Sequence, residues 1–316
     1  MGVLQAVRER ERGLLGVEGS ARHDRMPTSD ILFAGLINGL MAGGIYVLVA
    51  VGLTLIYGVL HIINFAHGSP LMLAMYAVFL LWRKPLGLDP YAALPIVTAG
   101  AFAFGYVLYR GLIGHFSHGK DENILLITLG LSIVIDNAAL VFFTGDTQTI
   151  DVAYAGRMIS LGPALVALPK LVSFAAALLI CLLLGLLMTR TDIGKAIRAV
   201  ARERRGARLV GIDVERVMAT SFGIGIACLG AAACLLMPTF YVSPSSGHAF
   251  VLIAFTIVAL GGMGSFKGAL LGGLLIGIVE SIGGLWLGEQ LGQIGIPLVF
   301  ILILLLRPTG LFGAAR

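Results

Sequence analysis

Two long stretches of the chain carry no Asp, Glu, Lys or Arg. They cover residues 31–82 and 217–266 and are 52 and 50 residues long. A helix needs about 20 apolar residues to cross the hydrocarbon of a bilayer, so each stretch is too long for one crossing by a straight helix of ordinary length. Each stretch therefore contains a break, and the backbone of a break inside a membrane must line a cavity or pack against protein.

The composition assigns the chain to the polytopic membrane proteins. Hydrophobic residues make up 58% of the chain, charged residues 12%, and the mean hydropathy is +0.97, whereas soluble domains are about a quarter charged. The 43 glycines suit close helix packing. The net charge of +5 fits a Lys/Arg bias in cytoplasmic loops rather than nucleic-acid binding. We predict an all-α membrane protein with eight to ten transmembrane segments, surrounded by membrane lipid and without a nucleic-acid partner.

The two uncharged stretches share one pattern. In each, a long apolar segment is followed by a polar break and a short apolar segment: 31–57, 61–70 and 71–82 in the first, 217–237, 243–249 and 250–260 in the second. The short segments have about half the length of a span. Paired interrupted segments predict two pseudo-symmetric halves with half-helices that border a substrate pathway. The alternative is that both breaks are ordinary surface turns.

The remaining spans and the orientation follow from the charged loops. We predict further spans at 90–109, 123–143, 165–188, 269–287 and 291–306. The loop 189–216 holds eight of the 22 basic residues, which places it in the cytoplasm. Counting spans from this loop puts 110–122 inside and 144–164 outside, and we expect both termini inside.

The ends of the chain are polar tails. Residues 1–30 hold five Arg and five acidic residues without the apolar core of a secretory signal, so we expect a cytoplasmic tail. Met26 is an alternative start, and the sequence leaves open whether residues 1–25 belong to the native protein. The transmembrane domain is predicted over 31–310, and 311–316 form a C-terminal tail.

The basic loop contains an amphipathic pattern. Its apolar residues recur at helical spacing, with an interruption at Glu203 and Arg204 and a stop at Gly211: Ile193, Ala196, Ile197, Val200, Ala207 and Val210. Periodicity alone fits either a helix that rests on anionic lipid headgroups or a coupling helix that docks into a motor protein.

Several polar residues fall within apolar segments. An ionised side chain at membrane depth costs on the order of 2.5–3.5 kcal/mol, so such residues face a bundle interior or a cavity. A zwitterionic amino acid would suit intramembrane carboxylates together with helix N-termini near Leu71 and Phe250. The candidate pathway residues are Asn64, His67, Asp136, Asn137, Thr256 and Glu280. The alternative is that they bond neighbouring helices.

The break residues also have a structural interpretation. We rank His67 ahead of His248 as a substrate contact, and Asn64 is suited to bond backbone groups that Pro70 leaves open. Neither histidine has a metal partner at ligand spacing. The three cysteines lie in apolar runs and indicate neither a disulfide framework nor a metal site.

Three segments carry a family resemblance. NGLMAGGIYVLVAVGLTLIYGVLHIINFAHG (38–68), GKAIRAVARERRGARLVGIDVERV (194–217) and FTIVALGGMGSFKGALLGGLLIGIVE (255–280) together resemble the permease subunits of branched-chain amino acid ABC importers. The resemblance implies an inner-membrane permease of a bacterium. Its implied partners are a second homologous permease in a heterodimer or homodimer, two cytoplasmic ATPases and a periplasmic substrate-binding protein.

The resemblance also implies that the basic loop couples to the ATPases, although Arg198-Ala199 replaces the usual Glu-Ala-Ala start. The implied coupling residues are Gly194, Lys195, Ile197, Arg198, Val200, Ala207 and Gly211. The Gly-rich segment GGMGSFKGA (261–269) lacks the Gly-Lys-Ser/Thr of a phosphate-binding loop. We therefore expect no cofactor and no catalysis in this chain, with ATP bound and hydrolysed on partner subunits.

Other transport functions remain open at this point. Relatives of the same family that carry urea, amides or aromatic acids fit the same motifs. An ion-coupled secondary transporter would use Asp136 or Glu280 as a proton or sodium relay. A passive channel would conduct a small neutral solute downhill, and neither of these two classes needs a docking helix.

Overall fold

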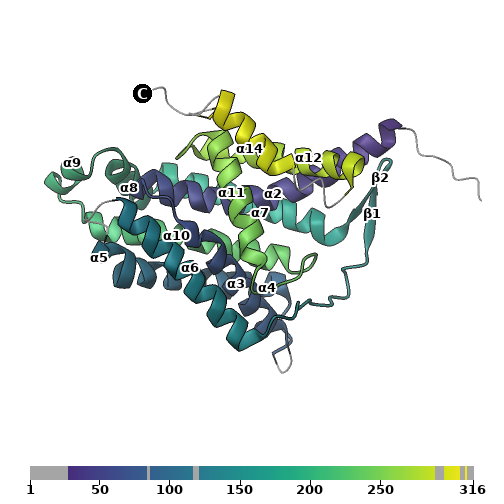
Figure 1. Cartoon of the computed structure of the whole chain (residues 1–316), viewed down its shortest axis with the longest axis horizontal. Helices are drawn as coiled ribbons and strands as arrows, with labels where there is room; N and C mark the ends of the chain where they lie inside the picture. Colours follow the sequence, from purple (N-terminus) through teal and green to yellow (C-terminus); the bar gives the residue numbers. More distant parts are fainter. Residues whose placement is uncertain (1–27, 84–85, 117–120, 289–294, 307–309, 312–316) are drawn as a thin grey trace, which may run out of the picture.

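The computed structural model of the 316-residue chain describes residues 28–83, 86–116, 121–288, 295–306 and 310–311. The predicted tails 1–30 and 311–316 fall almost entirely outside these ranges. Figure 1 shows a bundle of long helices with a two-stranded hairpin at one end and two short helices at the other. The polytopic helical class predicted from composition is confirmed.

The long helices follow the predicted spans closely. They are α2 (Thr28–Leu60), α3 (Gly68–Trp82), α4 (Pro90–Leu108), α6 (Asp121–Phe143), α7 (Leu168–Arg190), α10 (Val214–Leu236), α11 (Ser246–Gly261), α12 (Phe266–Leu287) and α14 (Gly295–Leu306). Within the described ranges, seven helices are long and apolar enough to cross a membrane. The 16 residues of α11 and the 12 of α14 are fewer than a full span needs.

Both predicted breaks are present, but the first is narrower than expected and the second lies earlier in the chain. The first covers the residues 61–64, after which the 3-10 helix η2 (Phe65–His67) leads directly into α3. Pro70 lies in the first turn of α3, where proline is tolerated because the N–H groups have no helical partner. The helix α11 likewise begins at Ser246 rather than at 250.

The connection between α6 and α7 contains β structure, which the all-α prediction missed. Strands β1 (Met158–Leu161) and β2 (Ala164–Ala167) pair antiparallel around Gly162, which has φ +64°. Ala164 and Val166 alternate onto the buried Met41 of α2. The predicted span 165–188 therefore begins later, at Leu168, where Pro169 opens α7.

The predicted start of the loop 110–122 was also wrong. The chain stays helical after α4, through a π-helical turn η3 (Tyr109–Ile113) and the short α5 (Gly114–Phe116). Tyr109 and Ile113 are buried, and the Tyr109 ring lies 5.9 Å from that of Phe222 on α10. Packing of these two side chains on the bundle extends the helix beyond the point where Arg110 suggested an end.

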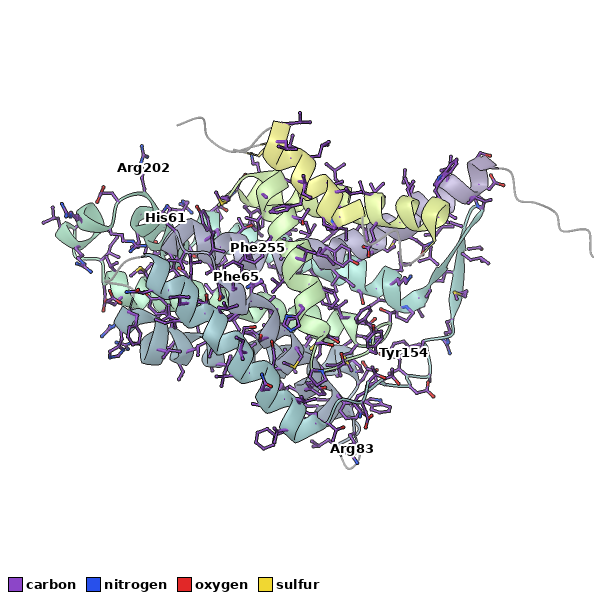
Figure 2. All side chains as sticks on the ribbon, viewed as in Figure 1. His61, Phe65, Arg83, Tyr154, Arg202 and Phe255 are labelled. Atoms are coloured by element: carbon purple, nitrogen blue, oxygen red, sulfur yellow. The ribbon has the colours of Figure 1, made fainter. Side chains whose placement is uncertain are left out.

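The helix α2 runs from one end of the bundle to the other. Its first residues lie near the hairpin, and its last residue, Leu60, lies beside α8 (Asp192–Arg202) and α9 (Arg204–Leu209), as Figure 1 shows. Figure 2 shows His61 and Arg202 at this second end, and Arg83 and Tyr154 at the opposite end. The helix packs mainly on α12 and α10, while α10 also packs on α4.

Two glycines allow a close approach of α2 and α10. A Cβ at Gly52 of α2 would lie 2.5 Å from the carbonyl oxygen of Gly225 on α10, and a Cβ at Gly225 would lie 2.8 Å from that of Gly52. The glycine-rich composition thus serves close contact between helix backbones, as is typical of transmembrane bundles.

A tyrosine–aspartate bond fastens the end of the bundle where the hairpin lies. Asp89 caps α4 by accepting from the Tyr91 N–H at 2.9 Å, and its second oxygen accepts from the Tyr154 hydroxyl at 2.7 Å. Burial, and then the bond to the Asp89 carboxylate, raise the pKa of Tyr154 above its ordinary value. This bond ties the connection after α6 to the start of α4.

Replacing Tyr154 by phenylalanine should lower the free energy of unfolding by about 1 kcal/mol, since a partly exposed bond to a carboxylate is lost. A raised folded-state pKa makes this contribution present below the unfolded value of about 10 and lost as the pH rises through the folded value. Thermal unfolding in detergent at pH 7 and pH 11 checks both points. Tyr241→Phe, which removes an exposed hydroxyl, is the control, and an equal loss in both variants would contradict the assignment.

Candidate functional site

The two breaks meet inside the bundle. A Cβ at Gly247 would lie 2.5 Å from the carbonyl oxygen of Gly68, and a Cβ at Gly68 would overlap the carbonyl oxygen of Gly247. The first turns of α3 and α11 therefore cross in backbone contact. Neither helix has a side-chain cap at its start. Two helix N-termini, each carrying the partial positive charge of its helix dipole, thus converge at one point.

Asn64 and His67 support the first break. The Asn64 side-chain oxygen accepts from the Ala66 N–H at 3.1 Å and starts η2. The His67 ring is 0% exposed, and its Nε2–H donates to the carbonyl oxygen of Val49 on α2 at 3.0 Å. Among the described residues, Asn64 Nδ2 and His67 Nδ1 have no hydrogen-bond partner. Both side chains bond the backbone, and the ring of His67 is closed off from any pathway in this conformation.

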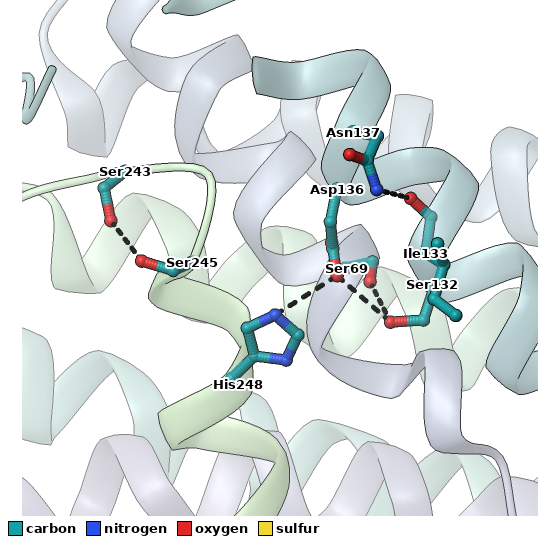
Figure 3. A network of polar contacts seen from close by, with 8 residues as sticks. All are labelled: Ser69, Ser132, Ile133, Asp136, Asn137, Ser243, Ser245 and His248. Atoms are coloured by element: carbon teal, nitrogen blue, oxygen red, sulfur yellow. Dashed lines mark hydrogen bonds and ion pairs between the residues drawn. The ribbon is translucent and has the colours of Figure 1, made fainter. Parts of the chain in front are cut away.

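A polar network lies beside the first turns of α3 and α11, as Figure 3 shows. Ser69 on α3 bonds Ser132 on α6, with 2.9 Å between the hydroxyl oxygens. Ser132 donates to Asp136 Oδ2 at 3.2 Å, and His248 Nε2 on α11 lies 3.4 Å from the same oxygen. The network joins three helices, and its members come from positions far apart in the sequence.

The network opens toward the surface of this chain. The Asp136 side chain is 15% exposed, while that of His248 is 67% exposed. A fixed carboxylate beside two helix N-termini offers partners for both an ammonium and a carboxylate group. A zwitterionic ligand thus has complementary charges here.

The other predicted pathway residues have separate partners. Asn137 is exposed and donates to the Ile133 carbonyl oxygen of its own helix at 2.8 Å. Thr256 is fully buried and donates to the Leu252 carbonyl oxygen at 2.8 Å. Glu280 on α12 lies beside Tyr46 on α2.

Sequence reasoning missed part of the network, and of the two break histidines only His248 belongs to it. Ser69 lies within the predicted break 61–70 but was not among the candidate pathway residues, and Ser132 carries no distinguishing sequence signal. His248 was ranked behind His67, yet His248 is exposed beside a carboxylate and His67 is buried. The only available signal for His248 was its place in the second break.

The basic loop forms two helices, α8 and α9, where one amphipathic helix with an interruption at Glu203 and Arg204 was predicted. Thr191 caps α8 by accepting from the Gly194 N–H at 3.1 Å, and Glu203 caps α9 by accepting from the Arg205 N–H at 3.1 Å. Gly211, with φ +86°, follows the end of α9. The predicted helical periodicity and the glycine stop are confirmed.

The apolar face of these helices packs on this chain's own bundle. Four of the predicted coupling residues are buried there: Gly194, Ile197, Val200 and Ala207. The other three, Lys195, Arg198 and Gly211, are exposed. Three apolar side chains also remain exposed on this loop: Ile193, Leu209 and Val210, with Leu209 88% exposed.

Comparisons with known proteins identify the family of the chain. The family model described as the permease component of branched-chain amino acid transport systems matches residues 35–306. The chain belongs to this family. The permease is therefore a component of a membrane transport system, and the resemblance found in its motifs is confirmed.

Individual relatives span nearly the whole permease. It is 33% identical to the high-affinity branched-chain amino acid transport permease BraD of Pseudomonas aeruginosa, over 88% of this chain and 94% of the relative. The corresponding permease LivH of Escherichia coli is 30% identical with the same coverage. The solved structure "PsaBC from Streptococcus pneumoniae in complex with Fab" covers 88% of this chain with 16% identity and a TM-score of 0.49.

Proposed function

We propose that this permease is the transmembrane subunit of an ATP-driven importer for branched-chain or other hydrophobic amino acids in a bacterial inner membrane. The observation that carries the proposal is the family match over residues 35–306. The helix pair α8–α9 adds support, because it stands at one end of the bundle with exposed apolar and basic side chains. In this proposal ATP binds and is hydrolysed on partner subunits.

The proposed pathway passes the crossing of α3 and α11. The Asp136 carboxylate receives the ammonium of the substrate, and the N-termini of the two half-helices favour its carboxylate. His248 holds Asp136 when no substrate is present. A second homologous permease closes the exposed side of this network, and a periplasmic binding protein delivers the amino acid to the pair.

The packing of the helices supports two pseudo-symmetric halves. A pseudo-symmetry operation would exchange α2 with α10, α3 with α11 and α4 with α12. It would place the α2–α12 contact on the α10–α4 contact, and both contacts are extensive. The same operation maps the α2–α10 and α3–α11 contacts onto themselves. The Gly52–Gly225 and Gly68–Gly247 contacts then lie on the axis, and alternating access would rock one half against the other.

The basic loop sets the orientation of the permease. With α8 and α9 in the cytoplasm by the positive-inside rule, the Leu60 end of α2 is cytoplasmic and its Thr28 end is external. This replaces the expectation of a cytoplasmic segment before α2. The C-terminal end of α11 is cytoplasmic in this orientation. Leu311 lies on the same side, because its N–H donates to the Leu260 carbonyl oxygen at 2.7 Å.

The ATPase contact is formed by the exposed side of α8 and α9. Since Ile197, Val200 and Ala207 are covered by the bundle, they hold the loop in place, and the partner binds Ile193, Leu209 and Val210 within a basic rim. Exposed apolar side chains beside Arg205 and Arg208 suit a groove with acidic edges.

Replacing residues 194–212 by a Gly/Ser linker should abolish co-purification of the ATPases while the permease still inserts into the membrane. Leu209→Ser should weaken ATPase binding severalfold, because an exposed apolar contact is lost, whereas Leu140→Ser on α6 serves as a control at an exposed apolar position remote from the loop. Full ATPase binding by the linker variant would show that the loop is not the coupling element.

A further inference from the structure

At the cytoplasmic end of α2, the last backbone carbonyl oxygens are bonded by a group from outside the helix. His61, with φ +57°, turns the chain and donates its N–H to the Tyr57 carbonyl oxygen at 2.7 Å. The following carbonyl groups of the last turn, at Val59 and Leu60, lie in buried residues and have no partner in the helix itself. Groups outside α2 must bond these two carbonyl oxygens.

Arg204 provides those bonds from the basic loop. Its Nη2 lies 2.7 Å from the Leu60 carbonyl oxygen and 3.3 Å from that of Val59. A cation at a helix C-terminus also opposes the negative end of the helix dipole. Other loop cations pair with nearby carboxylates instead, such as Lys195 with Asp192 at 2.9 Å and Arg216 with Asp213 at 2.8 Å.

This contact joins two parts of the molecule that matter for transport. Arg204 is the first residue of α9, whose cap is Glu203, so it moves with the helix pair that contacts the proposed ATPase. Leu60 is separated from Asn64 by only three residues of break, and Asn64 and His67 lead into the first turn of α3. The path from Arg204 to the Ser69 network is thus short: it runs through the hydrogen bond to Leu60 and then along the polypeptide through the break.

We infer that Arg204 is a positioning residue that transmits movement of α8–α9 to the end of α2 and through the break to the pathway. The inference rests on the proposed function. The Nη2 atom of a guanidinium carries two N–H donors, one for each of the two adjacent carbonyl oxygens. A lysine ammonium can replace the charge and the donors, but its nitrogen lies one bond nearer to Cα and does not reach the same position.

The test uses the assembled complex of permease, ATPases and binding protein in proteoliposomes, with labelled leucine as the probe. ATP hydrolysis and uptake are measured on the same vesicles. Arg204→Gln should retain ATPase binding and hydrolysis but lower leucine taken up per ATP by roughly tenfold, with Arg204→Lys intermediate. Arg190→Gln, at an exposed position of α7 outside the α8–α9 pair, should keep the parental ratio.

Several outcomes overturn the inference. A parental uptake-to-hydrolysis ratio in Arg204→Gln excludes transmission, and so does a loss of ATPase binding that accounts for the whole loss of uptake. If Arg204→Gln does not fold, a parental ratio in a folded Arg204→Lys overturns the inference, and a reduced one supports it. Failure of the proposed function gives a different result, since the unsubstituted complex would then show no ATP-dependent leucine uptake.

Discussion

Replacing Gly247 by alanine should abolish amino-acid uptake and lower the stability of the permease by about 3 kcal/mol, the upper end of the usual cost of overpacking. The added Cβ would lie 2.5 Å from the Gly68 carbonyl oxygen and 2.7 Å from its carbon. These are backbone atoms in the first turn of α3, which cannot swing aside as a side chain can. The two half-helices would have to separate.

Gly130→Ala on α6 is the matched control, because a Cβ there meets nothing within 4 Å. We expect it to leave uptake unchanged and stability unchanged or slightly higher, since alanine is the better helix former. Thermal unfolding in detergent and uptake in proteoliposomes measure both variants. Parental stability and uptake in Gly247→Ala would show that the half-helices do not depend on this contact.

Asp136→Asn should lower leucine uptake by ten- to a hundredfold, because the substrate ammonium loses a charged partner. The amide keeps the shape of the side chain and can still accept from Ser132, so the folded bundle should persist. Neighbouring Asn137, whose amide donates to the Ile133 carbonyl oxygen of its own helix, provides the control.

Uptake as a function of leucine concentration separates these variants. Asn137→Ala should match the parent, while Asp136→Asn should raise the concentration needed for half-maximal uptake. Equal losses in both variants would indicate general damage to α6, and parental uptake in Asp136→Asn would remove this carboxylate from the pathway.

The sequence predicted the breaks because an uncharged stretch of 52 or 50 residues cannot be one helix. The predicted first break was too wide because it included HGSP (67–70). Proline breaks the interior of a helix but fits its first turn. The hairpin β1–β2 escaped prediction because its four-residue strands are apolar and adjoin an apolar helix. Short apolar runs carry no periodicity that separates strand from helix.

The candidate site was only partly predictable, for a reason that lies in tertiary structure. Ser69 and Ser132 are 63 residues apart, and a serine becomes a network member only when helix packing brings it to another polar group. The amphipathic pattern of α8 identified an apolar face correctly. Periodicity cannot tell whether the chain's own bundle or a partner covers that face, and here the bundle covers Ile197 and Val200.

The most direct test of ATP-driven import is labelled-leucine uptake into proteoliposomes. One set contains the permease with its partner permease, ATPases and binding protein, and the other contains the permease alone. We predict uptake only in the complete set and only with ATP supplied on the ATPase side, independent of proton or sodium gradients. Uptake by the permease alone, driven by an ion gradient or running downhill, would contradict the account.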